Sequence, residues 1–411
     1  MAYASNASGQ LRYIAESTRN VIPGVGNCTN IRQVGPTLKA AVSTTKSEEI
    51  RTDRLSTGSV RTDLSVDGGF NFELSGKEYD PFLCGLLGQS TFTHYGTLGL
   101  GAAIGTSLVA TSLLLTAGVA PTTTSAFSLL APGSWFKVIP SVGVAQSVKD
   151  YYADAWFKVA STTTTTIVLD ASTPIGAAGL TSGGALGASA KISQSSIVNG
   201  STFGTFSMEY ALTDITQFLT YTGCQVNNMD LSLDVGSIVK GSFGFIGQGH
   251  TMQATTLLPG SPVVSQTLEV MNSVTDIGVI YENGTSILGA TSFIKSLKLS
   301  VNNNARAQKA LGIFGSAGVG LGELAISGTM EVFLQDATYY QKWLQGTNTS
   351  LSVGVADNQG NGYMIDFDKI TFKDAGLTMS GRDDVMLSLP FDAFYSPTAN
   401  RGIRITRAVA A

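Results

Sequence analysis

The chain carries one pattern twice, in the segments 63–83 and 323–343. In both segments an apolar residue or a glycine occupies every second position, and the two series match one another in order. The matched pairs are Leu64 and Leu324, Val66 and Ile326, Gly68 and Gly328, Phe70 and Met330, Phe72 and Val332, and Leu74 and Leu334. Upstream, LKAAV at 38–42 returns as LKLSV at 297–301. The repeat indicates that one supersecondary unit is duplicated, so the chain must form a fold that is built twice.

The period of the repeat predicts a strand followed by a short helix. Alternation of apolar and polar residues is typical of an antiparallel strand with one face in water. The glycine within the strand, Gly68 or Gly328, predicts a bulge or a sharp bend. The apolar residues that follow have helical spacing, and Gly88 and Gly346 stand where helix C-caps occur, while Asp336 is placed to cap the second helix.

A further pair of strands is predicted in each half. Residues 226–248 alternate around a turn at 234–237, and residues 364–394 do the same around 380–384. Glycine and aspartate at these turns favour hairpins. The fold class is therefore mostly β, with two tandem copies of a β-sandwich or barrel unit, one short helix in each copy, and a small inserted β domain.

The composition excludes several classes of protein. Only 13% of the residues are charged and the net charge is −4, so there is no basic surface for tight binding to nucleic acid. Three cysteines without close spacing fit reduced, buried thiols rather than a disulfide scaffold or a zinc site. The N-terminal sequence lacks the basic and apolar regions of a signal peptide, so we do not expect secretion by that route.

The inserted domain follows a stretch with almost no charge. Residues 98–120 are long enough to span a bilayer, but they are diluted by Gly, Ser and Thr and have no basic flanks. We favour a linker over a membrane span. It leads to two strand-like segments, 133–141 and 153–170, that share the sequence Trp-Phe-Lys-Val. A small β domain inserted at an exposed loop would point away from the main contacts. The predicted organisation is an N-terminal arm (1–35), a first unit (36–96 and 201–250), the inserted domain (97–200), a linker (251–291), a second unit (292–395) and a C-terminal arm (396–411).

No pattern in the sequence supports catalysis. The two histidines, His94 and His250, lack a matching Cys or Asp motif. The run 99–105 resembles a dinucleotide loop, but it neither follows a buried strand nor precedes a suitably spaced acid. Residues 357–368 approach the spacing of a calcium loop, although a hairpin turn explains them more simply. We predict no catalytic residue, cofactor or metal, and a protein that is not an enzyme.

The densest charge lies at 46–63, in the long connection of the first copy. Its mixed signs suit contact with an identical subunit, although a solvated hairpin would look the same. The corresponding connection in the second copy, 302–323, is more apolar. The candidate contact residues are Glu48, Glu49, Arg51, Asp53, Arg54, Arg61, Arg306 and Lys309.

Several ordered segments resemble the tail tube proteins of long-tailed bacteriophages. In the first half they are SEEIRTDR, GGFNFEL, KEYDPFL and the long run from YALTDITQFL to GSFGFIG. In the second half they are VNNNARAQKALG, GELAISGTMEVFLQDATYYQKWL and DVMLSLPFDAF. No single motif is highly specific, but the ordered set is, and it covers nearly all of the chain outside the insert and the ends.

The resemblance implies a structural protein of the virion. Sandwiches with one flanking helix would join into a ring, inner strands would complete a β-barrel, and rings would stack into a tube. The loops 46–63 and 302–323 and both terminal arms would make the contacts between rings. The tape measure protein and DNA would pass through an acidic or neutral lumen without specific binding, and tail terminator and baseplate or tip proteins would meet the ends. Assembly would occur in the host cytoplasm without a membrane, and the outer insert favours a non-contractile, siphovirus-type tail.

The duplication adds a stoichiometry to this expectation. If each chain carries two tube units, three chains supply six and close a ring with pseudo-sixfold symmetry, whereas a ring of six chains is the alternative. A different class is a surface glycan-binding or adhesin-like β protein in which the repeated unit is a stalk. In either class the insert would make the glycan contact, weakly in the tail protein.

Overall fold

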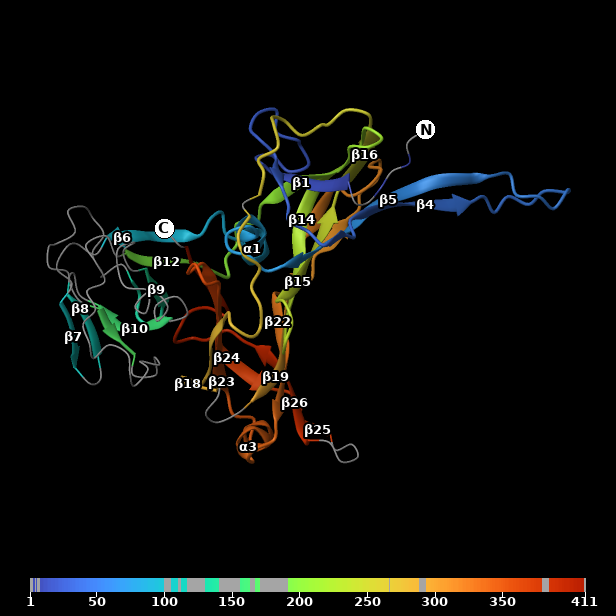
Figure 1. The fold of residues 1–411 in the computed structure, drawn as a ribbon. Helices are drawn as coiled ribbons and strands as arrows, with labels where there is room; N and C mark the ends of the chain where they lie inside the picture. The colour runs from blue at the N-terminus through green and yellow to red at the C-terminus, as the bar shows by residue number, and fades with distance from the viewer. Residues whose placement is uncertain are drawn as a thin grey trace.

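The computed structural model describes residues 8–99, 105–109, 112–116, 130–139, 156–162, 167–170, 191–265, 267–287, 293–378 and 384–409, together with Tyr3 and Ser5. These residues form antiparallel strands and two short helices, so the mostly-β class is confirmed (Figure 1). The first half contains β1 (Gly9–Glu16), β2 (Thr29–Asn30), β3 (Gly35–Pro36), β4 (Lys39–Lys46), β5 (Ser59–Glu73), α1 (Asp80–Leu87), β13 (Thr205–Leu212), β14 (Gln217–Asp234), β15 (Lys240–Gly247) and β16 (Gly249–Gln253).

The remaining elements belong to the insert and to the second half. Between α1 and β13 lie β6 (Thr93–Gly99), β7 (Gly105–Val109), β8 (Ser112–Thr116), β9 (Trp135–Ile139), β10 (Phe157–Thr162), β11 (Ile167–Leu169) and β12 (Lys191–Val198). The second half contains β17 (Ile277–Glu282), β18 (Thr285–Ser286), β19 (Ile294–Asn302), β20 (Arg306–Gln308), β21 (Gly318–Gly320), β22 (Ala325–Phe333), α3 (Thr338–Leu344), β23 (Thr349–Ala356), β24 (Gly362–Phe372), β25 (Gly376–Thr378), β26 (Met386–Ala393) and β27 (Arg404–Ala408).

The two halves pair their strands in the same order. In the first half the order is β1–β13–β14–β15–β5–β4. In the second half it is β17–β23–β24–β26–β22–β19. The strands β5 and β22, which carry the sequence repeat, occupy the same position in the two orders. Phe70 of β5 lies opposite Phe243 of β15, and its counterpart Met330 of β22 lies opposite Leu389 of β26. The sequence repeat is therefore accompanied by a repeat of strand topology.

One pairing joins the halves into a single surface. The C-terminal part of β14 pairs with β15 on one side and with β19 on the other, with Leu231 opposite Leu299. This produces a run of eight strands, β4–β5–β15–β14–β19–β22–β26–β25, which we name the long sheet. Its apolar face covers one hydrophobic core that draws on both halves.

The core explains why the predicted helices form where they do. Phe70 and Phe72 stack against Tyr79 and Phe82 at ring distances of 4.4–6.5 Å, so α1 is held on the apolar face of β5. The predicted C-terminal glycines are confirmed, because Gly88 adopts a left-handed φ of 66° at the C-cap of α1 and Gly346, with a φ of 61°, follows the C-cap Gln345 of α3. The predicted cap at Asp336 is displaced by one residue: the N-cap of α3 is Ala337, and the amide of Thr338 donates to Asp336 Oδ1 at 2.8 Å just before the helix.

The shared glycine was predicted to mark a bulge or a sharp bend, and no bulge occurs there in the ladders β5–β15 and β22–β26. On the other edge of β5 the amides of Thr37 and Leu38 both donate to the Gly69 carbonyl, so that ladder is irregular beside Gly68. The pairing of β5 with β15 and of β22 with β26 passes Gly68 and Gly328 without a shift of register. A Cβ on Gly68 would lie 2.2 Å from the Thr37 carbonyl oxygen, and one on Gly328 would lie 2.4 Å from Phe391 Cζ. Glycine is needed at both positions because neighbouring groups approach the backbone closely, and at Gly68 also because φ is 99°.

The segments expected to be arms and a linker are instead parts of the sheet. Within 1–35, β1 pairs with β13 along its whole length. Within 251–291, β17 pairs with β23. Within 396–411, β27 lies between β12 and β24. Each of these strands is short, and its partner is distant in the sequence, so local alternation gave little indication of it.

The described part of the insert packs against the second half. Trp135 and Trp156 are buried in a cluster with residues of β17, β24 and β27, and the rings of Trp135 and Tyr281 lie 5.3 Å apart. In Figure 1 the insert lies on the side of the molecule opposite the β4–β5 hairpin. It is therefore attached to the back of the core, away from that hairpin.

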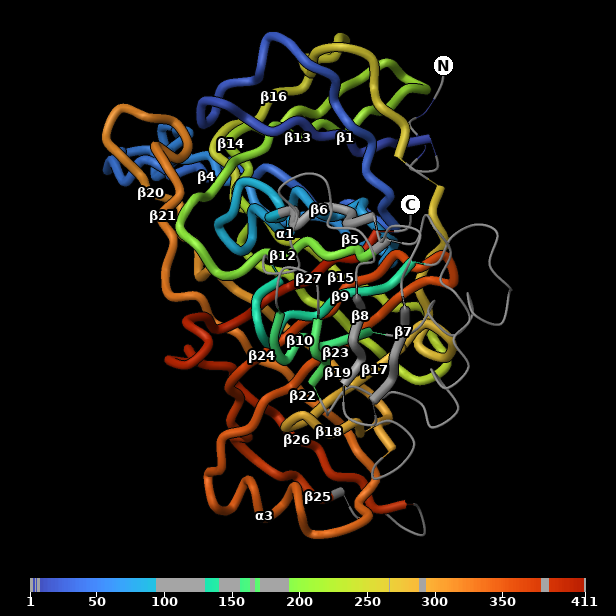
Figure 2. The backbone as a smooth tube through the Cα atoms, turned by 90° about the vertical axis from the view of Figure 1, so that its left-hand side faces the viewer, coloured from blue at the N-terminus to red at the C-terminus, as the bar shows by residue number. Residues whose placement is uncertain are grey.

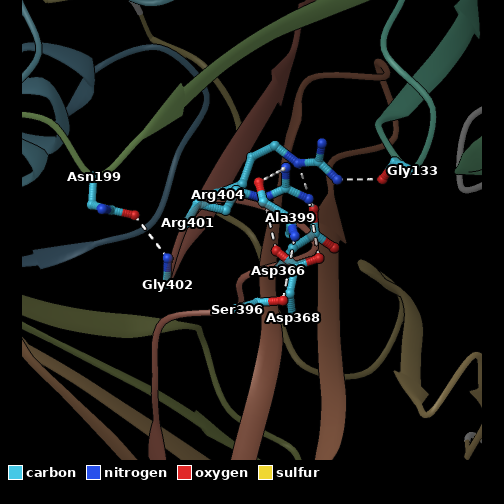
Figure 3. Close-up of polar contacts among 9 residues, drawn as sticks. All are labelled: Gly133, Asn199, Asp366, Asp368, Ser396, Ala399, Arg401, Gly402 and Arg404. Atoms are coloured by element: carbon cyan, nitrogen blue, oxygen red, sulfur yellow. Dashed lines mark hydrogen bonds and ion pairs between the residues drawn. The ribbon is translucent and has the colours of Figure 1, made fainter.

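Buried charges fasten β27 to its neighbours (Figure 3). Arg404 Nε lies 3.3 Å from Asp366 Oδ2 in β24, and both side chains are 5% exposed. The same guanidinium donates to the carbonyl of Gly133 in the insert. Nearby, Arg401 Nε lies 2.7 Å from Asp368 Oδ2. One cluster thus links the C-terminal strand, the second half and the insert.

A second buried contact links β27 to the first half. Asp80, in the first turn of α1, accepts a hydrogen bond from the Tyr363 hydroxyl at 2.6 Å and pairs with Arg407. Burial raises the pKa of Asp80, although Arg407 and the tyrosine hydroxyl oppose the rise. Burial likewise raises the pKa of Asp366 against the opposing effect of Arg404. The loss of water therefore outweighs the pairing at both carboxyls.

We predict that Arg404→Met lowers the free energy of unfolding by about 3–5 kcal/mol, because it leaves the Asp366 carboxyl buried without its partner. A group whose folded pKa is raised loses its stabilising contribution as the pH rises through that pKa, so the defect should grow from about pH 5 to pH 8. Urea unfolding below the concentration at which chains assemble measures both effects.

The double variant Asp366→Leu with Arg404→Met should recover most of the lost stability, because neither charge then remains buried. Arg401→Met is the matched control, since it breaks a more exposed pair and should cost less. Equal stability of wild type and Arg404→Met at every pH would contradict this account of the cluster.

Candidate functional site

The β4–β5 hairpin carries most of the predicted contact residues. Its loop, 47–58, extends beyond the body of the molecule (Figure 1). The charged residues predicted to make contacts are all exposed there; they are Glu48, Glu49, Arg51, Asp53, Arg54 and Arg61. Arg51 NH2 lies 2.8 Å from Asp53 Oδ2, and this pairing lowers the pKa of Asp53. Both side chains are exposed to solvent, so their pair orders the loop without stabilising the fold appreciably.

The structure brings the two candidate loops together. Lys309, beside β20, donates to Asp63 Oδ1 at 2.7 Å and to the Leu64 carbonyl at 2.8 Å at the root of the hairpin. Figure 2 shows β20 and β21 beside β4. Arg306 is exposed on the same loop. The connections 47–58 and 303–324 therefore occupy one end of the long sheet, which we name the loop rim.

Apolar side chains are exposed on the loop rim, and our sequence reasoning singled out only the charged ones. Ile50 is 98% exposed and Leu311 is fully exposed. The others on this rim are Leu55, Val60, Ile313 and Phe314. The signal available in the sequence was the apolar character of 302–323. In the first copy, Ile50 and Leu55 lie within the most highly charged segment, so the charge of 46–63 drew attention away from them.

The other end of the long sheet has short turns. There β14 turns into β15 through 235–239, and Ser273 is bonded to this turn through its backbone amide and its hydroxyl. Val235 and Val274 are exposed at about 70% on this end, which we name the turn rim. The second turn of this rim, predicted at 380–384, lies almost entirely outside the described residues.

The polar face of the long sheet is hollowed. A hollow of about 730 Å³ lies over its strands, and alternation brings their polar side chains to it. Its polar lining comes from both halves, with Asn71, Asp230, Ser232, Lys240, Ser242, Lys298, Ser300, Ser327 and Thr329 among the residues. Apolar residues contribute to the lining as well, among them Val34, Leu231, Leu299 and Phe391. The hollow spans the junction of β14 and β19, so the two halves form one concave surface.

Charge on this face is balanced or acidic within the described strands. Alternation along the strands places Asp67, Asp230, Asp234, Glu331 and Asp392 on it, against Lys39, Lys240 and Lys298. Lys373, which follows β24, also lines the hollow, and its Nζ lies 2.7 Å from Asp392 Oδ2. Lys39 Nζ likewise lies 3.6 Å from Asp67 Oδ1. Bases and acids are therefore mixed on this face, and two of the lysines have acidic partners.

The two outer strands of the long sheet have unpaired edges among the described residues. β4 pairs only with β5, and β25 pairs only with β26. Unpaired edges present free backbone donors and acceptors to another chain. The candidate site is thus a set of assembly surfaces, namely two rims, a concave face and two edges.

No group of acidic, cysteine or histidine side chains in the described part of the chain is arranged to hold a metal ion. Asp357 instead accepts hydrogen bonds from the amides of Gln359 and Asn361 in the β23–β24 turn, as the hairpin interpretation predicts. His250 stacks on Tyr221 at 4.6 Å, and burial lowers its pKa. Among the described helices, none has the length and apolar character to cross a bilayer.

Comparison with protein families identifies the assembly to which these surfaces belong. The model of the phage tail tube protein family matches residues 6–393, which is nearly the whole chain. The chain belongs to this family. It is therefore a structural protein of a bacteriophage tail, and the family suggests a role other than catalysis. A comparison with curated protein sequences gave no match.

We predict that Lys309→Ala in this tail tube protein changes the free energy of unfolding by less than about 1 kcal/mol, since its pair with Asp63 is substantially exposed. It should nevertheless accelerate amide hydrogen exchange in 306–320, because the loop loses its attachment to the hairpin. Lys39→Ala, which removes a more exposed pair elsewhere, should leave that exchange unchanged. Exchange in 306–320 that is identical in wild type and Lys309→Ala would refute the attachment.

Proposed function

We propose that three copies of this tail tube protein close into a ring and that rings stack into the tube through which phage DNA is ejected. The observation that carries the proposal is the long sheet, in which one strand order occurs twice and both outer edges are unpaired. A chain with two equivalent units has an internal junction between them, and the same junction repeated between chains closes a ring without free edges.

Three chains supply six units, so the ring has true threefold and pseudo-sixfold symmetry. The units correspond to 36–96 with 201–250 and to 292–395, each extended by the strand before it, β1 or β17. The same edges would also permit a ring of six chains with twelve units. We favour three because the duplication gives each chain two units, so that three chains supply the six units of a pseudo-sixfold ring.

The shape and polarity of the concave face support our placing it as the wall of the lumen. Polar side chains from both halves line it, and its three lysines, Lys240, Lys298 and Lys373, lie among the acids of the same face. Duplex DNA and the tape measure protein would pass such a wall without being retained, because nearby acids offset the lysines that could neutralise phosphate. The described part of the insert packs through Trp135 and Trp156 against β17, β24 and β27, away from this face, which supports a place for the insert (97–200) on the outside of the tube.

The rims support stacking of one ring on the next. The loop rim carries Ile50 and Leu55 beyond the body, and the turn rim exposes Val235 and Val274. Burial of such side chains between rings would stabilise the stack at roughly 25 cal/mol per Å² of apolar area. The mixed charges of 46–63 would then fix the rotation of one ring on another.

This arrangement has consequences for the remaining parts of the tail. Assembly in the host cytoplasm would leave the two ends of the tube with different rims, one for a tail terminator and the other for a baseplate or tip protein. An outer insert would obstruct a contractile sheath, which favours a siphovirus-type tail. A weak glycan contact by the insert remains part of this proposal.

The proposal is tested by negative-stain microscopy of the purified protein, followed by measurement of mass per ring in the scanning transmission microscope. We expect hollow tubes whose mass per ring corresponds to three chains of 42.8 kDa. A mass of six chains would replace the trimer by the hexamer. A protein that remains monomeric under all assembly conditions would refute the function.

The double variant Ile50→Asp with Leu55→Asp tests the role of the loop rim. Both side chains are exposed, so the monomer should melt at the wild-type temperature, while tube growth should slow about tenfold or more because charge would be buried between rings. Val264→Asp, which changes an exposed valine outside both rims, is the matched control. Light scattering measures the growth, and unchanged growth of the double variant would exclude the loop from stacking.

A further inference from the structure

The junction between β14 and β19 shows how one unit meets the next. There Asp230 lies opposite Ser300 and Leu231 opposite Leu299 in an antiparallel pair. The Ser300 hydroxyl donates to Asp230 Oδ1 at 2.6 Å across this junction. Because both halves have the same strand order, the counterparts of these residues identify the strands that would meet between copies.

The counterpart of β19 is found through its partner β22. Val301 lies opposite Ile326, and Ala40 lies opposite Val66, which is the match of Ile326 in the repeat. Ala40 thus corresponds to Val301, and one residue before it Lys39 corresponds to Ser300. The same pairing makes Leu38 the counterpart of Leu299. The sequence match of 38–42 with 297–301 would instead make it the counterpart of Leu297, two residues earlier.

The counterpart of the C-terminal part of β14 is β25. Asp230 lies opposite Ser242, and Ser242 in turn lies opposite Asn71. Gly376 lies opposite Ser388, and Ser388 lies opposite Glu331, the counterpart of Asn71. Gly376 therefore corresponds to Asp230, and the next residue, Leu377, corresponds to Leu231.

We propose that β25 of one copy pairs antiparallel with residues 37–41 of the next copy, with Gly376 opposite Lys39 and Leu377 opposite Leu38. The proposal rests on the ring inferred above and specifies its register. No strand pairs with the outer edge of either segment among the described residues, and Leu377 is 38% exposed, in contrast to the buried Leu231. In the single chain the Leu38 amide donates to the Gly69 carbonyl and the Leu38 carbonyl accepts from the Tyr221 hydroxyl, so pairing with Leu377 would exchange these two bonds. A second copy would cover this leucine as β19 covers its counterpart.

The register can be tested by disulfide formation. A Cβ added to Gly376 meets nothing nearer than 3.9 Å, and Lys39 is exposed, so cysteine fits both sites without disturbing the monomer. The native cysteines, Cys28, Cys84 and Cys224, are buried and free, which keeps them out of the reaction. The double variant Gly376→Cys with Lys39→Cys is assembled into tubes, oxidised and run on a non-reducing gel.

We expect covalent products of two and three chains and none larger, because the chain of cross-links closes on itself. The control Asp230→Cys with Ser300→Cys has the same geometry inside one chain and should oxidise without a change in chain number. The variant Gly376→Cys with Ala41→Cys is two residues out of register, beyond disulfide reach, and should react about tenfold more slowly or less.

Mixing the two single variants, Gly376→Cys and Lys39→Cys, during assembly should give products of two chains only, which excludes a cross-link within one chain. Tubes that form but cross-link faster through Ala41 than through Lys39 would overturn the register. Tubes without cross-links in either variant or in the mixed assembly would overturn the edge pairing and leave the proposed function standing. Failure of the wild-type protein to form tubes would instead refute the proposed function.

Discussion

The pairing of β14 with β19 is the interaction on which the rest of the structure depends. It converts two four-stranded halves into one long sheet with a common core on one face and a common hollow on the other. The halves also meet in the core and through Asp80, Tyr363 and Arg407, but the strand pairing sets the register between their contact surfaces. With it, the geometry from one unit to the next is fixed inside the chain before any second copy arrives.

The interior charges fix the rest of the architecture at some cost in stability. Asp80 and Asp366 both have raised pKa values despite their arginine partners, so replacing a whole pair by apolar residues of similar size would cost far less than breaking it. The contacts are specific in geometry. Arg404 pairs with Asp366 of β24 and donates to the Gly133 carbonyl of the insert, and Arg407 pairs with Asp80 of α1. They position the insert on the back of the core, where it leaves both rims and both edges of the long sheet uncovered.

Much of the fold could be predicted because its signals are local. The alternation in 63–74 and 323–334 predicts β5 and β22, and Gly88 and Gly346 correctly mark the C-terminal ends of the helices. The strands β1, β17 and β27 were missed because their partners are distant in the sequence. At Gly68 no bulge occurs in the ladder with β15, and a close carbonyl and a positive φ account for that glycine. The charged hairpin was predictable as a candidate site, but its contact with Lys309 and the free edge of β25 depend on tertiary structure.

The central claim is that the junction inside the chain and the junction between chains are equivalent, and a cryo-electron microscopy reconstruction of assembled tubes tests it most directly. The account predicts an unbroken inner wall with eight strands from each of three chains, in which the β25–β4 contact superimposes on the β14–β19 contact. Three inserts would project outward from every ring. A wall interrupted between chains, or one closed by strands other than β4 and β25, would contradict it.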